Sequence, residues 1–216
     1  MTLSPSREDY VRRGDGWQAI ILAAGAGRRF GGGKLVAEWR GAPLVQAAVR
    51  TALSATVEGV TVVLGAGAEA VAEAVRPLSD PRLRTVVAPD WIEGMATSLV
   101  TGIKALPADT RGVVVFLADM PLIPSGLADR LLDAVDQGAP AAVVRSLLGP
   151  AHPVAFSAEV FPALLALKGD RGARSVLDGL GKAVSVLDCD DPGVTFDVDR
   201  VNDLGAGPAS GPLPHC

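Results

Sequence analysis

Residues 22–34 read Leu-Ala-Ala-Gly-Ala-Gly-Arg-Arg-Phe-Gly-Gly-Gly-Lys and begin at the end of the apolar run Ala19–Ala23. The apolar run predicts a buried strand, so the glycines form a loop at its carboxyl end. Glycine permits positive φ and a close approach of an anion to the backbone, and successive amides can form an anion-binding nest. Lys34 adds a mobile positive charge, and Arg29 adds a planar group that can hold two phosphate oxygens. The stretch therefore predicts an α/β fold with a phosphate-binding loop after its first strand.

Two widespread phosphate loops do not match this stretch. The loop is long and basic, and no acidic residue is placed to bind a ribose, which excludes the dinucleotide fingerprint. Lys34 is followed by Leu35, whereas a Walker A loop has Ser or Thr after its lysine. The alternative interpretation is a glycine-rich turn between a strand and a helix, with arginines that are simply solvated.

Short apolar runs alternate with longer amphipathic stretches in the rest of the chain. The runs are continuous and rich in β-branched residues, as expected for strands covered on both faces. This alternation predicts a single-domain, Rossmann-like, doubly wound α/β fold with a mostly parallel sheet, which binds ligands beyond the carboxyl ends of its strands. The expected strands are Ala19–Ala23, Val60–Leu64, Thr85–Val87, Val113–Leu117, Ala142–Arg145, Val154–Phe156 and Val184–Leu187. The expected helices are Pro43–Ala55 with proline in its first turn, Ala68–Val75, Ala96–Ala105, Ser125–Val135 with a capping serine, Ala158–Leu167 and Ala173–Leu180.

Length and composition indicate the domain organisation and exclude several classes of protein. The chain has 216 residues, a net charge of −4, no basic block and only 4% aromatic residues, so no nucleic-acid partner is expected. No apolar run approaches the ~20 residues of a membrane span and the N-terminus lacks a secretory signal, so we expect a cytoplasmic protein without membrane contact. We expect a disordered arm at 1–16, one domain at 17–204 and a flexible tail at 205–216. Cys189 and Cys216 are too few for a disulfide framework and are expected as thiols.

An aspartate follows the apolar run Val113–Leu117, in the sequence Ala118-Asp119-Met120-Pro121. A carboxylate at a strand end, followed by a stiffening proline, suits a metal site. Mg²⁺ keeps several waters and takes one or two carboxylates together with phosphate oxygens, so Asp119 alone is enough to begin such a site. The alternative is an ordinary aspartate in a turn.

A second acidic segment lies near the end of the domain, where Asp197 and Asp199 flank Val198. Residues two apart in an extended segment point to the same face, so both carboxylates are candidates for completing the metal site. We slightly favour Asp199 over Asp197, and which of the two is the ligand stays open. Either could also be a solvated surface residue.

Three further loops carry candidate binding residues. Gly94 precedes a helix and allows close backbone approach, and Ser98 offers a hydroxyl in its first turn; the alternative is a plain helix start. A lone histidine is more often structural than catalytic; the other interpretation of His152 is that it positions an acceptor by hydrogen bonding rather than acting as a base. Arg171 and Arg174, at the start of another helix, could grip an acceptor phosphate or instead pair with surface carboxylates.

Leu22–Lys34 resembles the signature Leu-Ala-Ala-Gly-x-x-x-Arg-Met/Phe-Gly-x-x-Lys of the MobA-like NTP transferases, in the branch that includes molybdenum cofactor cytidylyltransferase. The later segments resemble this family's Leu-Ala-Asp-Met-Pro, Gly-Met-x-x-Ser-Leu, Gly-His-Pro and Gly-Asp-x-Gly-Ala-Arg motifs. The family also has Thr-Pro after its last acidic pair, whereas this chain has Arg200-Val201, which leaves the second metal ligand open. The resemblance implies a fold of the nucleotide-diphospho-sugar transferase type. It implies nucleotide binding by Leu22, Ala23, Ala24, Gly25, Ala26, Gly27, Arg29, Lys34, Gly94 and Ser98.

The resemblance also implies a reaction. An acceptor phosphate would attack the α-phosphorus of an NTP and release pyrophosphate, with Arg29, Lys34 and Asp119 as catalytic residues and Mg²⁺ as the cofactor. The pair Ala23-Ala24 resembles the CTP-using branch, so CTP and molybdopterin are the implied partners, with a molybdoenzyme apoprotein as a possible transient one. Three alternatives stay open: transfer to another phosphorylated acceptor, including GTP-dependent transfer or transfer to a sugar or alcohol phosphate; an oxidoreductase of heterocycle catabolism; and a non-catalytic nucleotide- or cofactor-binding protein.

Overall fold

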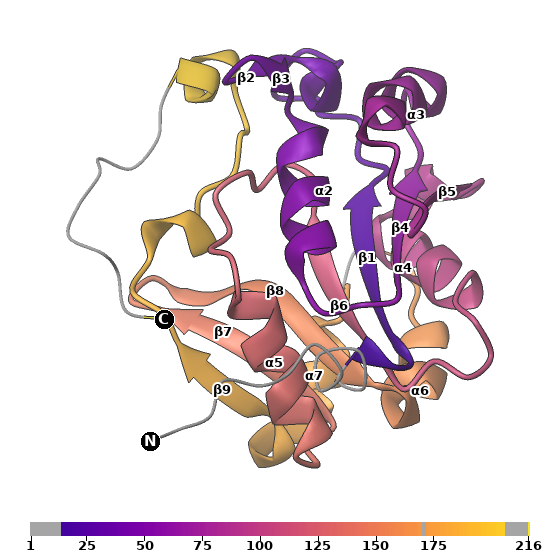
Figure 1. Cartoon of the computed structure of the whole chain (residues 1–216), viewed down its shortest axis with the longest axis vertical. Coiled ribbons are helices and arrows are strands. Elements are labelled where there is room, and N and C mark those ends of the chain that lie inside the picture. Colours follow the sequence, from indigo (N-terminus) through magenta and orange to yellow (C-terminus); the bar gives the residue numbers. More distant parts are fainter. Residues whose placement is uncertain (1–13, 170–171, 206–215) are drawn as a thin grey trace.

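The computed structural model describes residues 14–169, 172–205 and 216, and contains a seven-stranded sheet with helices on both faces (Figure 1). The strand order is β5-β4-β1-β6-β8-β7-β9. All neighbours pair in parallel except β8, which is antiparallel to β6 and β7. The α/β fold with a mostly parallel sheet is therefore confirmed. The strands are β1 (Trp17–Ala23), β4 (Gly59–Leu64), β5 (Leu83–Val87), β6 (Gly112–Leu117), β7 (Ala141–Ser146), β8 (Gly149–Ser157) and β9 (Ser185–Asp188).

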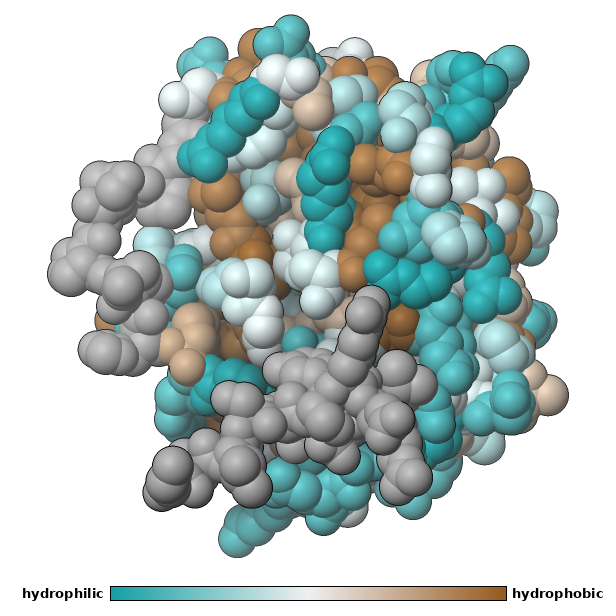
Figure 2. Space-filling view, viewed as in Figure 1, coloured by the Kyte–Doolittle hydropathy of each residue, from teal (hydrophilic) through white to brown (hydrophobic). Residues whose placement is uncertain are grey.

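The central strand β1 supplies side chains to two separate cores. Ala19 and Ile21 point into one core and Ile20 into the other, because successive side chains of a strand alternate between faces. The first core is closed by α2 (Val45–Ser54), α3 (Ala68–Val75) and α5 (Leu127–Asp136), and the second by α4 (Met95–Lys104), α6 (Phe161–Leu165) and α7 (Arg174–Leu180). Figure 1 looks onto the face covered by α2 and α5. Hydrophilic residues cover much of this face, with hydrophobic ones grouped between them (Figure 2).

The order of the strands places one crevice at the open edge of the sheet. After β1 the chain moves outward through β4 to β5, and it then returns to β6 on the opposite side of β1. Where two connections leave neighbouring parallel strands in opposite directions, the loops separate and leave room for a ligand. That point lies between the carboxyl ends of β1 and β6, from which the glycine loop and the Asp119 loop emerge.

Several boundaries differ from the sequence-based expectation. Gly149–Pro153 was expected to be a loop, but it forms the first half of β8. Pro43 lies in the short strand β3 (Ala42–Pro43), not in the first turn of α2. Gly126, with φ of 81°, takes the N-cap position of α5 in place of Ser125. A left-handed glycine before the helix moves its start one residue later. The expected helix at 158–167 is a short 3-10 turn followed by α6, with Pro162 in the first turn of α6. The small ribbon of β2 (Glu38–Trp39) and β3 (Ala42–Pro43) was not expected.

Two further predictions concern the ends of the chain and the two cysteines. The predictions for the arm at 1–16 and the tail at 205–216 fall mostly outside the described residues and stay predictions. The expectation of two thiols is wrong, because Cys189 and Cys216 form a disulfide. Within the described ranges, no helix is both long and apolar enough to cross a membrane.

Candidate active site

The glycine loop leaves β1 at Ala24 and ends where a 3-10 turn (Lys34–Val36) begins. It is folded on itself, because the amides of Phe30 and Gly32 both donate to the carbonyl of Gly27, at 3.0 and 3.3 Å. Positive φ is needed at four of its glycines, at positions 27, 31, 32 and 33. Any other residue would be strained there, so the glycine content follows from the path of the loop.

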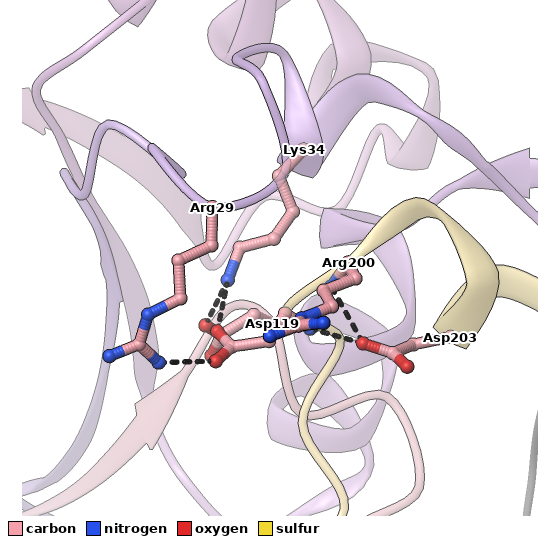
Figure 3. A network of polar contacts seen from close by, with 6 residues as sticks. Arg29, Lys34, Asp119, Arg200 and Asp203 are labelled. Atoms are coloured by element: carbon pink, nitrogen blue, oxygen red, sulfur yellow. Dashed lines mark hydrogen bonds and ion pairs between the residues drawn. The ribbon is translucent and has the colours of Figure 1, made fainter.

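Lys34 crosses from this loop to the carboxylates on the other side of the crevice (Figure 3). Its Nζ lies 2.7 Å from Oδ2 of Asp119 and 3.7 Å from Oδ1 of Asp199. The lysine side chain is only 11% exposed, so this ion pair is partly shielded from solvent. One ammonium group thus bridges two carboxylates that are 80 positions apart in the chain.

The Asp119 loop and the acidic segment are held side by side by backbone hydrogen bonds. The amide of Ala118 donates to the carbonyl of Leu22 at 3.1 Å, and the amide of Val198 donates to the carbonyl of Asp119 at 3.0 Å. Val198 is fully buried, which leaves Asp197 and Asp199 on the opposite face of their segment. The expected period of two is therefore present in the structure.

Asp199 is the better connected of the two carboxylates. Arg29 Nη1 lies 2.6 Å from its Oδ2, and hydrogen bonding to Arg29, together with the charge of Lys34, lowers the pKa of Asp199. By contrast, loss of solvation, followed by the charges of Asp199 and Asp119, raises the pKa of Asp197. The geometry therefore ties Asp199 to the two loop cations and places Asp197 in an environment that disfavours its charge.

Asp203 is a site residue that the sequence interpretation missed. Its Oδ2 accepts the amides of Asp199 and Arg200, at 2.9 and 2.6 Å, and so fixes the turn after the acidic pair (Figure 3). An aspartate whose side chain accepts nearby amides is a known turn-forming device. Asp203 is the third residue of a short 3-10 segment (Val201–Gly205), and no local pattern in the sequence singled it out.

No group of three or more His, Cys, Asp or Glu residues forms a ready-made metal cluster in the part of the chain that the structure describes. Mg²⁺ needs fewer protein ligands when a nucleotide supplies phosphate oxygens. Asp119 and Asp199 already share one cation, the Lys34 ammonium, and their oxygens are of the type that Mg²⁺ prefers. The residues thus fit a metal that arrives with phosphate, with Asp197 as a further candidate ligand.

A cavity of about 400 Å³ lies between the glycine loop and the start of α4. Asp119 lies at its wall, and Trp91, in a 3-10 turn (Trp91–Glu93), was not expected there. Of the expected nucleotide-binding residues, Ala23 has its side chain in the core, and Gly27 lies in the loop turn and not in the cavity wall. The lining includes Leu22, Ala24, Gly25, Ala26, Arg28, Trp91, Ile92, Gly94, Met95, Ser98, Leu117 and Asp119.

The start of α4 is shaped for close approach to this cavity. Gly94 takes a φ of 127°, which a residue with a side chain rarely adopts, and it stands at the N-cap. Thr97 Oγ1 donates to the carbonyls of Asp90 and Gly94, both at 2.8 Å, so its hydroxyl is used inside the turn. Ser98, which was expected to offer its hydroxyl to the nucleotide, lines the cavity but is buried, with 3% of its surface exposed.

The residues expected to bind the acceptor are His152, Arg171 and Arg174. His152 lies in β8 near Asp119; burial lowers the pKa of its imidazole, and the Asp119 charge opposes this shift. Its Nδ1 is buried and makes no hydrogen bond to the described residues. Arg174 is exposed at the first residue of α7, and the nearby Gly172 lies beside Met95 of the cavity wall. Arg171 lies outside the described residues.

A family model described as the MobA-like NTP transferase domain matches residues 19–186, which include the glycine loop and the Asp119 loop. The chain belongs to this family. It is 36% identical over 194 residues to the nicotine blue oxidoreductase of Paenarthrobacter nicotinovorans, covering 86% of this chain and 93% of that protein. It is 33% identical over 187 residues to the purine catabolism protein PucB of Bacillus subtilis, covering 83% and 90%. A 2-C-methyl-D-erythritol 4-phosphate cytidylyltransferase of Streptomyces coelicolor is 33% identical over 141 residues, covering 63% and 50%.

Solved structures of similar proteins share this fold over most of the chain. Rv0371c from Mycobacterium tuberculosis superimposes with a TM-score of 0.76 and 29% identity, covering 87% of this chain and 94% of that one. A complex of Rv0371c with manganese superimposes with a TM-score of 0.67 and 27% identity, covering 81% and 88%. This MobA-like chain therefore has a nucleotidyltransferase-type fold as well as the family's sequence.

Proposed function

We propose that the protein transfers a nucleoside monophosphate from an NTP to a phosphorylated small-molecule acceptor. The observation that carries the proposal is the bridge from Lys34 to Asp119 and Asp199, at the crevice between β1 and β6 and beside the 400 Å³ cavity. A phosphate-binding loop, cations and carboxylates meet there at one point. Such a set suits phosphate chemistry, in which positioning and charge neutralisation provide most of the catalysis.

The proposed reaction forms one bond and breaks one bond at phosphorus. An acceptor phosphate oxygen attacks the α-phosphorus of the NTP, the bond from that phosphorus to the bridging oxygen breaks, and pyrophosphate leaves. Lys34 and Arg29 neutralise the charge that develops on pyrophosphate, and the loop amides hold its oxygens. The acceptor phosphate is already anionic, so no strong general base is required.

Mg²⁺ is the proposed cofactor, held by Asp119 and Asp199 with Asp197 nearby. When bound, it would neutralise phosphate oxygens and so favour attack at the α-phosphorus. The manganese complex of Rv0371c supports a divalent cation in a protein of this fold. The chain's own contribution is the carboxylates of Asp119 and Asp199, and Asp203 keeps Asp199 in place through the turn.

CTP and molybdopterin are the favoured substrates within this proposal. Ala23-Ala24 in the loop and the cytidylyltransferase relative support CTP. His152 and Arg174, with Arg171, are the proposed acceptor contacts. A molybdoenzyme apoprotein as a transient partner and a cytoplasmic location belong to the same proposal.

A second candidate function has one observation in its favour. The nicotine blue oxidoreductase relative covers most of this chain, and its name favours redox chemistry on a heterocycle as the second candidate. The sequence carries no dinucleotide fingerprint for a nicotinamide or flavin cofactor, and the site has the charges of a phosphate-transfer centre. Transfer is therefore the proposal that we place first.

Pyrophosphate release tests the proposal. CTP, GTP, ATP and UTP are each supplied with Mg²⁺, with and without molybdenum-loaded molybdopterin. We expect release from CTP that depends on the acceptor. Binding of NTP without release under every condition would contradict transfer to this acceptor, and redox turnover of a heterocycle without NTP would favour the second candidate.

A further inference from the structure

We propose that the ammonium of Lys34 occupies the cation position between Asp119 and Asp199 until a triphosphate binds, so that the divalent ion binds weakly before the nucleotide and tightly together with it. This inference rests on the proposed function and concerns the order of events at the same site. It follows from the position of one side chain. Nζ lies 2.7 Å from Asp119 and 3.7 Å from Asp199, and the side chain is almost fully covered.

The charges of the site support this order. Three carboxylates, of Asp119, Asp197 and Asp199, face two cations, of Lys34 and Arg29, so most of the negative charge is already balanced within the chain. A divalent ion bound to Asp119 while Lys34 stays in place would face a full positive charge within a few ångströms. This repulsion is large in a partly buried site.

A triphosphate removes this obstacle. Lysine carries its charge on a flexible stem, so Nζ can turn from Asp119 to phosphate oxygens while the backbone of the loop stays in place. The same oxygens complete the coordination of the ion, which Asp119 and Asp199 alone would leave unfinished. The absence of a ready-made three-residue metal cluster among the described residues agrees with a site that nucleotide completes.

Arg29 provides the matched comparison. It carries the same charge and pairs with Asp199 at 2.6 Å, but it is 77% exposed and makes no described contact with Asp119. Removing Arg29 lowers the positive charge near the site without clearing the place between the two carboxylates. Removing Lys34 does both.

The experiment measures Mn²⁺ binding to the full chain without nucleotide, by the electron paramagnetic resonance signal of free Mn²⁺. We expect Lys34→Met to bind Mn²⁺ more tightly than the wild type by on the order of tenfold, and Arg29→Met by no more than about threefold. Lys104→Met, at the exposed end of α4, should leave the affinity unchanged. In the double variant Lys34→Met/Asp119→Asn the gain should disappear.

Two results would overturn the inference. One is an Mn²⁺ affinity of Lys34→Met equal to or below that of the wild type, and the other is an equal gain in Arg29→Met, which would indicate a general charge effect. If thermal unfolding shows that Lys34→Met does not fold, Lys34→Gln gives the same comparison. The measurement uses neither acceptor nor turnover, so failure of the proposed reaction and failure of this inference can be told apart.

Discussion

Arg29 Nη1 lies 2.6 Å from Asp199 Oδ2, although the two residues are 170 positions apart in the chain. The contact joins the loop after the first strand to the last acidic segment of the domain. Together with the ion pair between Lys34 and Asp119, this contact brings the first loop and the last acidic segment of the domain to the same crevice. The site therefore depends on the whole domain being folded, and its residues can be tested one at a time.

Asp119→Asn tests the carboxylate at the centre of the site. The amide keeps the shape of the side chain but loses the charge that pairs with Lys34 and would hold the metal. We expect kcat/KM for acceptor-dependent pyrophosphate release to fall at least 100-fold, a magnitude typical of losing one electrostatic contact at a reacting centre. Asp109→Asn, in an exposed loop, is the control. Comparable loss in both variants, or full activity of Asp119→Asn, would argue against the assigned role.

Asp203→Ala tests the turn that positions Asp199. The variant leaves the amides of Asp199 and Arg200 without their acceptor, so the acidic segment should loosen. Loss of such a side-chain acceptor costs about 1 kcal/mol. We expect the metal concentration for half-maximal activity to rise about fivefold, following that energy, with little change in kcat at saturating metal. Asp203→Asn retains an acceptor and should recover most of the effect, and an unchanged metal requirement in Asp203→Ala would contradict this account.

Gly65→Ala tests the wall of the cavity. A Cβ at this position would lie 2.6 Å from the Cβ and carbonyl oxygen of Ala24 and 2.7 Å from Cγ of Trp91. Both neighbours line the cavity and would be pushed toward it, so we expect a higher KM for nucleotide and a loss of about 1–3 kcal/mol in the free energy of unfolding. Gly179→Ala in α7 meets no atom within 4 Å and should be neutral or slightly stabilising. If the Gly65→Ala variant is destabilised but keeps a normal KM for nucleotide, Trp91 does not contribute to nucleotide binding.

Asp80 predicts a pH dependence of stability away from the site. Its carboxylate accepts hydrogen bonds from the side chain and backbone of Arg82, and these bonds lower the pKa of Asp80. Because the folded pKa lies below the unfolded value of about 3.9, the contribution is complete above that pH and is lost as pH falls through the folded pKa. The pair is partly exposed, so the contribution should be below about 1 kcal/mol. Denaturant unfolding of wild type and Asp80→Asn should differ at pH 7 and converge below about pH 4, and a difference that grows in acid would contradict the assignment.

The strands could be predicted from the sequence, but several of the segments between them could not. Runs such as Val113–Leu117 are buried on both faces of the sheet, and such strands appear in the sequence as continuous apolar runs. Gly149–Pro153 looks like a loop because of its prolines, yet pairing with β7 makes it a strand. Strands β2 and β3, of two residues each, are too short for any periodicity to indicate them.

The site was predictable as a set of residues but not as a set of contacts. Local patterns indicated Lys34 and Asp119, because the glycine loop that ends in Lys34 and the Asp119 loop each follow an apolar run. Their ion pair depends on β1 and β6 being neighbours, which only the sheet order determines. The role of Asp203 depends on the path of the turn around it, and Trp91 reaches the cavity because Gly65 leaves space beside it.

Nucleotidyl transfer can be observed by following label from CTP. The protein is incubated with Mg²⁺, molybdenum-loaded molybdopterin and CTP labelled with ³²P at either the α- or the γ-phosphate. We expect the α-label to move to the acceptor and the γ-label to leave in pyrophosphate, and we expect both to stay in CTP with Asp119→Asn. Transfer of the γ-label to the acceptor, or an α-label that never leaves the free nucleotide pool, would contradict this expectation.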